Sequence, residues 1–346
     1  MKINLLFSKR NSIGKTLLNG FRKLGHEVDI LDLSNEINSN MHKLHNQSFR
    51  LPNSLKRVWQ KFYRDRIHNH YLSLIDNNPA ELFVIYNSQM LTPEIVRHIK
   101  DSGSKVVFFL GDSPFYTRTN EFFINILYLA DYIFSPDSYW IFQLKMMGIK
   151  NIAFLTPGFH PEIFKKVIPT PEELEKYNNN CVFLGLNYDS ILGYKRTLFL
   201  SKFADFGLKI YGSNNWYRWI KAFPELQNSF QFIDSFISDE QWNLMCNCAK
   251  IHPIDANPGL INGIHIRIMD SIGSGILPIA EYRKDMDLVF PNNMLPTIKS
   301  YSEVGDTVKD YLNSATLRKE KNQELFEHIT KNHNNIQACK SILQCL

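Results

Sequence analysis

Residues 249–282 read as a strand, a polar loop, a short helix and a second strand, and this order constrains the fold more than any other stretch. The mostly apolar run 250–254 predicts a buried strand. Isoleucines recur at helical spacing over 264–272 and predict a short helix with one buried face. The apolar run 276–280 predicts the next strand. Such a unit builds a parallel sheet, and these sheets bind ligands at the carboxyl ends of their strands.

The loop and helix start of this unit carry groups suited to a phosphorylated ligand. After Asn262 and Gly263, the predicted helix start offers unpaired N–H groups and a positive dipole end, both of which favour phosphate. Arg267 can bind phosphate oxygens in bidentate fashion, or it is a surface arginine. Asp270 lies further along the helix, where a carboxylate can accept hydrogen bonds from two vicinal hydroxyls, as on a ribose.

Several residues of this segment match a known pattern. The segment resembles the donor-site segment of GT-B glycosyltransferases, most closely the group typified by the spore maturation protein CgeB. That group shows N-x-R-x-x-E-x-x-G-x-G, followed by a strand and an acidic–aromatic pair. The matching positions are Arg267, Asp270, Gly273, Gly275, Glu281 and Tyr282.

Two departures from the family pattern concern carboxylates. Asp270 stands where the group usually has Glu and is one methylene shorter. In the broader GT-B pattern of two Glu residues eight positions apart, the first position is Asn262. The resemblance places both residues among the donor-binding candidates and leaves open whether the loop supplies a paired carboxylate.

Composition indicates a two-domain globular protein. The 346 residues are 44% hydrophobic and 21% charged, and no run reaches the ~18 apolar residues of a membrane helix. Five scattered cysteines favour a reducing cytoplasm. A net charge of +5 suits anionic substrates or a membrane surface more than nucleic acid. We therefore expect a cytoplasmic protein, with the inner face of a membrane as an open location.

The alternation of apolar runs and helical patterns predicts an α/β fold with two Rossmann-like, doubly wound domains facing a cleft, the GT-B arrangement. The predicted boundaries place an acceptor-side domain at 1–160, a polar, proline-containing linker at 161–180 and a nucleotide-sugar-binding domain at 181–315. Residues 316–346 are predicted to form a helix that packs back toward the first domain.

Two loops of the second half are donor-site candidates. Gly185 and Asn187 follow a predicted strand, and Lys195 and Arg196 come soon after. Glycine lets a backbone approach a pyrophosphate and cations neutralise it, although a tight turn would need the same glycine. The resemblance assigns the diphosphate contact to this loop and a following basic residue.

Gly212 and Ser213 end the next predicted strand of this half. The resemblance places contacts to the nucleotide base here. The alternative is an ordinary loop between a strand and a helix.

Two residues of the first half are candidate general bases. Asp112 follows the apolar strand over 105–110, where an aspartate can take a proton from an acceptor hydroxyl. The CgeB-like group often has an acidic residue here, but Asp-Ser-Pro is also a good helix cap. His160 lies in the predicted interdomain break and is either an alternative base or incidental.

A basic and aromatic helix is predicted within residues 34–78. Leu55, Trp59 and Phe62 share one predicted face, and the other face is basic. It is either a packed helix with a solvated charged side or a surface for an anionic acceptor or membrane headgroups.

No pattern with metal-ligand spacing is found in the sequence. Asp285 and Asp287 have the D-x-D spacing of GT-A metal sites, but the two-domain pattern argues against that fold. Both are interpreted as part of a solvated loop.

The combined interpretation is a glycosyltransferase. We expect it to move a sugar from a nucleotide-diphosphate-sugar co-substrate to a glycan, lipid-linked or protein acceptor in cell-surface polysaccharide synthesis, without a metal or another cofactor. Two alternatives stay open: a binding protein without transfer activity, suggested by Asn262, and a glucosyltransferase acting on DNA bases, suggested by the basic helix.

Overall fold

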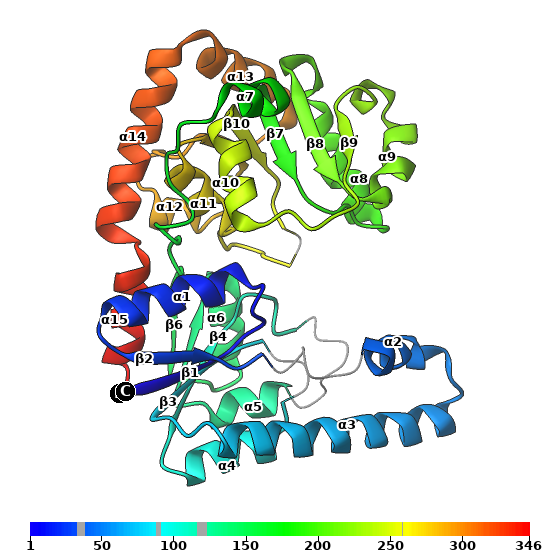
Figure 1. Cartoon of the computed structure of the whole chain (residues 1–346), viewed down its shortest axis with the longest axis vertical. Coiled ribbons are helices and arrows are strands. Elements are labelled where there is room, and N and C mark those ends of the chain that lie inside the picture. Colours follow the sequence, from blue (N-terminus) through cyan, green and yellow to red (C-terminus); the bar gives the residue numbers. More distant parts are fainter. Residues whose placement is uncertain (33–38, 88–90, 116–122, 258) are drawn as a thin grey trace. The chain divides into compact units, whose positions relative to one another are not determined.

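The computed structural model describes residues 1–32, 39–87, 91–115, 123–257 and 259–346, which divide into two compact units. Unit 1 comprises Met1–Pro157 and Asn335–Leu346, and unit 2 comprises Gly158–Asn334. Each unit has one parallel sheet flanked by helices (Figure 1). The prediction of an α/β fold with two Rossmann-like units is confirmed.

The sheet of unit 1 has the strand order β2-β1-β3-β4-β5-β6. Its strands are β1 (Lys2–Leu6), β2 (Glu27–Ile30), β3 (Leu82–Tyr86), β4 (Lys105–Phe109), β5 (Tyr132–Ser135) and β6 (Ile152–Phe154). Val84 and Val107 of the inner strands are fully buried, as expected for strands covered on both faces. The chain changes direction across the sheet between β1 and β3, which is the switch point of this unit.

Three of the described helices of unit 1 begin after a polar residue whose side chain caps the helix. The described helices of this unit are α1 (Ser12–Lys23), α2 (Ser39–Gln47), the 3₁₀ turn η1 (Ser48–Arg50), α3 (Asn53–Asp76), α4 (Pro93–Asp101), α5 (Phe123–Leu129), α6 (Ser138–Met146) and α15 (Asn335–Gln344). The side chains of Asn11, Thr92 and Asp137 accept backbone N–H groups at the starts of α1, α4 and α6.

Helix α3 is the predicted basic and aromatic helix, but its buried residues differ from the predicted apolar face. Its buried residues are Tyr63, Ile67, Tyr71 and Ile75, which lie four positions apart in its C-terminal half. Leu55 and Phe62, on the predicted apolar face, are 58% and 51% exposed, which fits the surface alternative for the first half of the helix. Only the later turns of α3 therefore present an apolar stripe to the core of unit 1.

The sheet of unit 2 has the strand order β12-β11-β10-β7-β8-β9. Its strands are β7 (Asn179–Leu184), β8 (Leu208–Gly212), β9 (Phe230–Phe232), β10 (Ala249–Ile254), β11 (Leu277–Glu281) and β12 (Thr297–Ile298). The chain builds outward from β7 on one side and then returns to β10 on the other. The switch point of unit 2 therefore lies between β7 and β10.

The helices of unit 2 include one whose start differs from the prediction. They are α7 (Pro171–Tyr177), α8 (Ile191–Ser201), α9 (Tyr217–Ala222), α10 (Asp239–Asn247), α11 (Arg267–Ser274), α12 (Met286–Val289), α13 (Val304–Asn313) and α14 (Ala315–Asn332), with 3₁₀ turns η2 (Ala204–Phe206), η3 (Asn214–Trp216), η4 (Pro224–Leu226) and η5 (Tyr301–Glu303). Helix α11 begins at Arg267 instead of Ile264, because Ile264 is buried within the preceding loop. Gly275 ends α11 with φ 87°, whereas Gly273 lies inside the helix.

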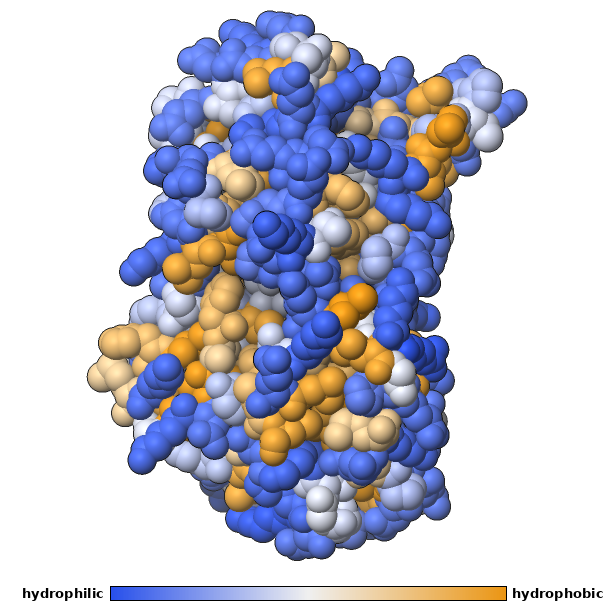
Figure 2. Space-filling model, turned by 90° about the vertical axis from the view of Figure 1, so that its left-hand side faces the viewer, coloured by the Kyte–Doolittle hydropathy of each residue, from blue (hydrophilic) through white to orange (hydrophobic). Residues whose placement is uncertain are grey.

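The C-terminal segment is split between the units. Helix α14 belongs to unit 2, and Figure 2 looks onto its mostly hydrophilic outer face. Helix α15 belongs to unit 1 and packs on α1, where Asn335 Nδ2 donates to the Thr16 carbonyl over 3.2 Å. Residues 161–180, predicted as a linker, include α7 with a capping box between Thr170 and Glu173. No described helix is long and apolar enough to cross a membrane.

The packing of α15 on α1 predicts that an added methyl group at Gly20 destabilises the fold, and Gly305 in α13 provides the comparison. A Cβ at Gly20 would lie 2.6 Å from Cys339 Sγ and 2.7 Å from the Asn335 carbonyl oxygen, whereas a Cβ at Gly305 in α13 meets nothing within 4 Å. Alanine favours a helix over glycine by roughly 0.5–1 kcal/mol. We expect Gly305→Ala to be neutral or stabilising and Gly20→Ala to destabilise by about 1–3 kcal/mol through overpacking, measured by urea unfolding. Equal effects of the two substitutions would contradict this packing.

Candidate functional site

The switch point of unit 2 brings two strand ends together. β7 and β10 are neighbours, with Asn179 opposite Ala249 and Cys181 opposite Ile251. Both strands run in the same direction, so the residues that follow them, Gly185 and Asp255, lie at the same sheet edge. In open α/β sheets, this edge at the switch point is where ligands bind.

The Arg267 side chain crosses from the first turn of α11 to the end of β7. Its Nη1 donates to the Leu184 carbonyl over 2.7 Å. A Cβ added to Gly185 would lie 3.3 Å from both Nη atoms, so the glycine lets the guanidinium lie against the backbone. Among the described residues no carboxylate forms an ion pair with Arg267, and its charge is left for another partner.

The Arg196 guanidinium donates hydrogen bonds from all three of its nitrogen atoms to protein groups. Its Nε donates to Asp255 Oδ2 over 2.8 Å, and its Nη atoms donate to the Leu186 carbonyl and to the Tyr188 hydroxyl. Its guanidinium carbon also lies 4.5 Å from the centre of the Tyr188 ring. Arg196 is 9% exposed, so it fixes the loop after β7 more than it offers donors to a ligand.

Both arginines lie near one aromatic ring, and their positive charges repel each other. Their guanidinium carbons lie 5.6 Å (Arg196) and 5.7 Å (Arg267) from the centre of the Phe183 ring. Burial first, and then the charge of Arg196, lowers the pKa of Arg267. A guanidinium stays protonated in proteins, so an anion bound beside Arg267 would relieve this repulsion.

Lys195 is neutralised by a carboxylate from another strand. Its Nζ donates to Glu281 Oε1 and Oε2 over 2.5 and 2.6 Å, and Glu281 Oε2 also accepts the Ala256 N–H over 3.0 Å. Of the three basic candidates, only Arg267 therefore lacks a carboxylate partner within the described chain.

Asp270 lies one turn into α11 and is 5% exposed. Burial first, and then the nearby charge of Asp239, raises the pKa of its carboxyl well above the usual range, although Arg267 acts in the opposite direction. Its Oδ1 is enclosed, and none of the described residues gives it a hydrogen bond. A buried acceptor without a donor is costly unless a ligand or water supplies one.

Two histidines beside the arginines stay neutral. His252 is fully buried and its Nδ1 lies 2.6 Å from Ser271 Oγ, and burial lowers its pKa. Burial and the charge of Arg267 lower the pKa of His265 to about 3. His265 Nδ1 also accepts the Arg267 backbone N–H over 3.1 Å, which occupies one donor of the helix start. At neutral pH the positive charge at this edge therefore comes from the arginines.

Three other donor candidates have structural roles in the described chain. Asn187 is buried, donates to Thr197 Oγ1 over 2.9 Å and accepts the N–H of Tyr188, so its amide shapes the loop. A Cβ at Gly212 would lie 2.3 Å from the Trp216 ring, which explains this glycine without a ligand. Ser213 Oγ lies 3.0 Å from Asn215 Oδ1.

The loop before α11 is tied to the segment after β11. Asn262 is half-buried, Gly263 is buried, and the Asn262 carbonyl accepts the Asp285 N–H over 2.9 Å. Asp285 is fully buried, so the predicted solvated loop is wrong there, while Asp287 is exposed and accepts the Tyr282 hydroxyl. Asp285 directly precedes helix α12, which starts at Met286.

Asp112 follows β4 in unit 1 and is exposed. Its Oδ2 accepts the Tyr86 hydroxyl over 3.2 Å, and its carbonyl accepts Asn87 Nδ2 over 2.6 Å. Burial first, and then the Asp112 charge, raises the pKa of Tyr86. Residues 113–115 are not helical, so among the described residues no helix begins directly after Asp112.

His160 belongs to unit 2, and its carbonyl accepts the N–H groups of Ile163 and Phe164 over 3.1 and 2.9 Å. Its half-buried side chain lies in the turn before α7. Within the described residues, no group of three or more metal-ligating side chains converges.

The candidate site contains residues to which the sequence interpretation assigned no role. Asp255, Tyr188 and His265 all contact the arginines or the helix start. Asp255 could have been predicted as a site residue from the sequence, because it is an acidic residue directly after a buried strand, as Asp112 is. The roles of Tyr188 and His265 depend on contacts with Arg196 and Arg267 that sequence spacing does not show.

Comparison with known proteins identifies the fold but does not identify a family. Neither the protein-family models nor the curated proteins gave a match to this chain. Among solved structures, it is similar to a sucrose-phosphate synthase from Thermosynechococcus elongatus, with a TM-score of 0.69 at 9% identity, covering 99% of this chain and 98% of that one.

Two further structures show the same likeness. One is described as trehalose-6-phosphate from E. coli bound with UDP-2-fluoro glucose (TM-score 0.65, 10% identity, 99% and 98% coverage). The other is a putative UDP-N-acetylglucosamine 2-epimerase from Listeria monocytogenes (TM-score 0.60, 10% identity, 99% and 94% coverage). The chain therefore has the GT-B fold. Because this fold carries both synthases and an epimerase, the fold alone does not fix the reaction.

The buried carboxyl of Asp270 gives a pH-dependent prediction. Its folded-state pKa is raised, so the folded chain binds this proton more tightly, and stability falls as pH rises from about 4 through the folded-state pKa. We expect Asp270→Asn to raise the free energy of unfolding at pH 7.5 by on the order of 1–3 kcal/mol. The difference should shrink toward pH 4, measured by urea unfolding without ligand.

The exposed Asp234 provides the control, and Asp234→Asn should change stability little at either pH. If Asp270→Asn were less stable than the wild type at pH 7.5, the carboxylate would have a favourable charged partner in the folded chain, contrary to the site described above.

Proposed function

We propose that this protein is a glycosyltransferase that uses a nucleotide-diphosphate-sugar as donor and holds it at the switch point of unit 2. The observation that carries the proposal is Arg267, whose guanidinium lies against Gly185 at the carboxyl edge of the sheet without a carboxylate partner in the described chain. A diphosphate supplies the negative charge that this site lacks, and guanidinium binds it in bidentate fashion.

The start of α11 supports the diphosphate position. Arg267 is the first residue of this helix, so the guanidinium and the positive end of the helix dipole lie close together. During transfer, negative charge grows on the departing nucleoside diphosphate. Groups that already point at that charge lower the barrier, because they need no reorganisation at the moment of reaction.

Asp270 is the proposed partner of the ribose. Its enclosed Oδ1 lacks a hydrogen bond from the described residues, and a sugar hydroxyl can donate one. A bound diol would also compensate part of the cost of burying this carboxyl. Glu281, on the neighbouring β11, accepts hydrogen bonds from Lys195. This ion pair links β11 to α8 beside the proposed site.

Removal of the Arg267 guanidinium should weaken donor binding. We expect Arg267→Ala to reduce affinity for the nucleoside diphosphate that gives the largest thermal shift in a panel of UDP, GDP, ADP and CDP. The expected loss is roughly tenfold to hundredfold, since hydrogen bonds to charged groups contribute about 1.5–3 kcal/mol. Arg267→Lys should recover only part of it, because lysine lacks the bidentate fork. Calorimetric titration measures both.

The matched control is Arg97→Ala, which removes an exposed arginine from α4 of unit 1. It should leave nucleotide affinity unchanged. Wild-type affinity in Arg267→Ala would remove the basis of the proposed donor site.

Asp112 is the proposed general base on the acceptor side. It is exposed at the carboxyl edge of the unit 1 sheet, and the Tyr86 hydroxyl and Asn87 amide fix its position. A carboxylate placed in this way can take the proton of an acceptor hydroxyl as the sugar is transferred. His160 is kept as the second candidate for this step.

Substitution of Asp112 should lower the rate of sugar transfer without changing the affinity for the nucleotide. We expect Asp112→Asn to lower kcat about a hundredfold or more, with nucleotide affinity unchanged, because general bases contribute roughly 10²–10⁴-fold. The assay follows transfer of radiolabelled sugar to glycan extracts, and Asp101→Asn at the exposed end of α4 is the control. Full activity in Asp112→Asn would transfer the role to His160 or to another group.

The same assay separates the alternatives. A binding protein would bind the nucleotide without transfer or hydrolysis of the donor, and epimerisation of the donor sugar would indicate the other reaction found on this fold. A DNA-base glucosyltransferase would shift DNA in a salt-dependent way. The resemblance to the CgeB-like group favours transfer, and it stays a proposal for this chain.

Helix α3 supports a lipid-linked acceptor at an anionic membrane surface. Leu55, Val58 and Phe62 are more than half exposed at helical spacing, and Arg57 and Lys61 are exposed beside them. Such a surface suits shallow insertion among negatively charged headgroups.

Vesicle co-sedimentation tests this surface. Binding to vesicles with phosphatidylglycerol should exceed binding to neutral phosphatidylcholine. We expect Val58→Ser with Phe62→Ser to reduce it about tenfold, through the loss of roughly 1.5–3 kcal/mol of apolar burial per side chain. Ile168→Ser, which replaces a 98% exposed residue of unit 2, should not reduce it. Equal binding by all variants would exclude α3 as the contact.

A further inference from the structure

Unit 2 contains a second polar cavity, far along α11 from the candidate donor site. It has a volume of about 810 Å³, within the usual range of ligand pockets. It lies beside the end of α10, the start of β10, the end of α11 and the first turns of α14. Its lining includes Cys246, Asn247, Lys250, Ser274, Gly275 and Asn322. The cavity is therefore at the amino edge of the sheet, opposite to Arg267.

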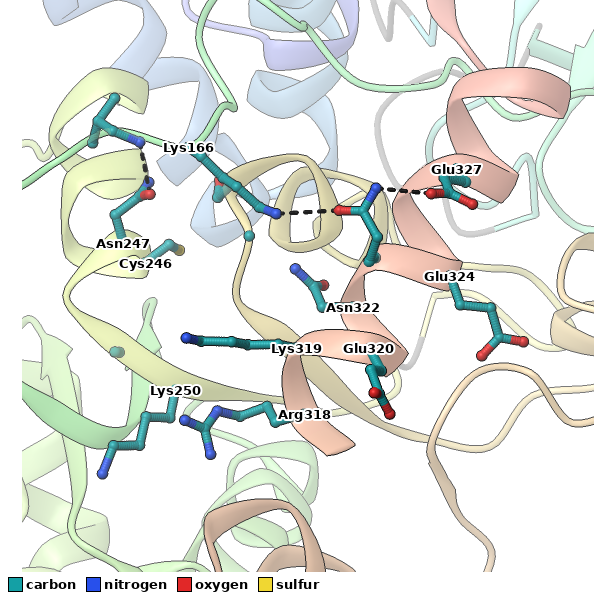
Figure 3. A pocket seen from close by; sticks show the side chains of 15 residues that line it. Lys166, Cys246, Asn247, Lys250, Arg318, Lys319, Glu320, Asn322, Glu324 and Glu327 are labelled. Carbon is teal, nitrogen blue, oxygen red and sulfur yellow. Dashed lines mark hydrogen bonds between the residues drawn. The ribbon is translucent and has the colours of Figure 1, made fainter. Parts of the chain in front are cut away.

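Asn322 is the unusual residue of this cavity. It is 3% exposed, and its Oδ1 is enclosed with no hydrogen-bond donor among the described residues. The described chain also gives its Nδ2 no acceptor, although this atom is not enclosed. Figure 3 shows the Asn322 amide pointing from α14 into the space between α14 and α10. A buried amide without partners is costly, so the site favours a ligand with hydroxyl groups.

Four cations of the lining lack a carboxylate partner within the described chain: Lys166, Lys250, Arg318 and Lys319. Lys250 Nζ donates to Asn180 Oδ1 over 2.7 Å. Arg318 Nη1 donates to the Tyr311 carbonyl over 2.6 Å, and burial lowers its pKa. Lys166 Nζ makes one long contact, 3.4 Å to Gln323 Oε1. Each of these side chains retains N–H donors for an anion.

The acidic residues of the lining do not neutralise these cations. Glu324 is paired with Lys321 over 2.6 Å, and Glu327 accepts Gln323 Nε2 over 2.9 Å. Figure 3 shows Glu320 and Glu324 on the opposite side of α14 from Lys319. The part of the cavity beside Asn322 therefore carries positive charge.

The segment that carries Lys166 is fixed in place. Asn243 Oδ1 accepts the Lys165 N–H over 3.0 Å, and Asn247 Oδ1 accepts the Val167 N–H over 2.9 Å. The Lys166 stem lies across Gly275, where a Cβ would be 2.9 Å from its Cγ. A side chain that is already positioned loses less entropy when a ligand binds.

We propose that this cavity binds a sugar phosphate, that is, a phosphate monoester with free hydroxyls, with the phosphate held by Lys166, Arg318 and Lys319 and a hydroxyl hydrogen-bonded to the Asn322 amide. The site is separate from the proposed donor site and does not depend on the proposed reaction. The pairing of cations with an unpartnered amide acceptor distinguishes this ligand class from a bare anion or a neutral sugar.

Calorimetric titration of the full chain with glucose 6-phosphate, in saturating UDP to occupy a donor site, tests the proposal. We expect saturable binding, with glucose and inorganic phosphate each at least about tenfold weaker. Lys319→Gln and Asn322→Leu should each weaken binding about tenfold. Lys321→Gln, on the same helix but paired with Glu324, is the matched control and should leave it unchanged.

A ligand-free measurement makes the test independent of the probe. Since Asn322 Oδ1 has no donor in the described chain, Asn322→Leu should keep or raise the unfolding midpoint. A lowered midpoint would show a structural partner and overturn the proposal. Absence of binding at millimolar glucose 6-phosphate, equal binding of inorganic phosphate, or loss of binding in Arg267→Ala would also overturn it, and none of these results bears on glycosyl transfer.

Discussion

The parallel pairing of β7 with β10 is the constraint on which the candidate site depends. It puts the ends of two strands that are distant in sequence at one sheet edge, and the Arg196–Asp255 ion pair closes that edge over 2.8 Å. Breaking one partner of such a buried pair would leave an uncompensated charge, so the loop after β7 is held firmly. The position of Arg267 against Gly185 follows from this arrangement.

Charge at the two ends of α11 is arranged differently. At its start, Arg196 and Lys195 are neutralised by Asp255 and Glu281, and Arg267 forms no ion pair with a carboxylate of the described residues. Beyond its end, the cations that lack a carboxylate partner in the described chain come from the segment before α7, from β10 and from α14. Both places are polar and partly enclosed, where an unbalanced charge interacts more strongly than on an open surface. This difference is why we assign ligands of different size and chemistry to the two ends.

The GT-B fold limits the function without choosing it. Synthases and an epimerase share it with this chain at 9–10% identity, so the assignment of transfer depends on side chains and not on topology. Asp112, held by Tyr86 and Asn87, is the feature of unit 1 that favours an acceptor reaction. The exposed first half of α3 favours an acceptor presented at a surface.

The sequence by itself determined the two Rossmann-like units, most strands, and the presence of Gly185, Arg267 and Asp270 near strand ends, because hydrophobic period and glycine position are local signals. It misplaced the start of α11 and could not decide whether the aromatic face of α3 is packed. The apolar character of Ile264 and Phe62 does not show which tertiary contacts each residue makes. Only the tertiary structure decided which cations are neutralised. Asp255 and Glu281 lie 59 and 86 positions from Arg196 and Lys195, and spacing in the chain carries no information about pairs that the sheet brings together.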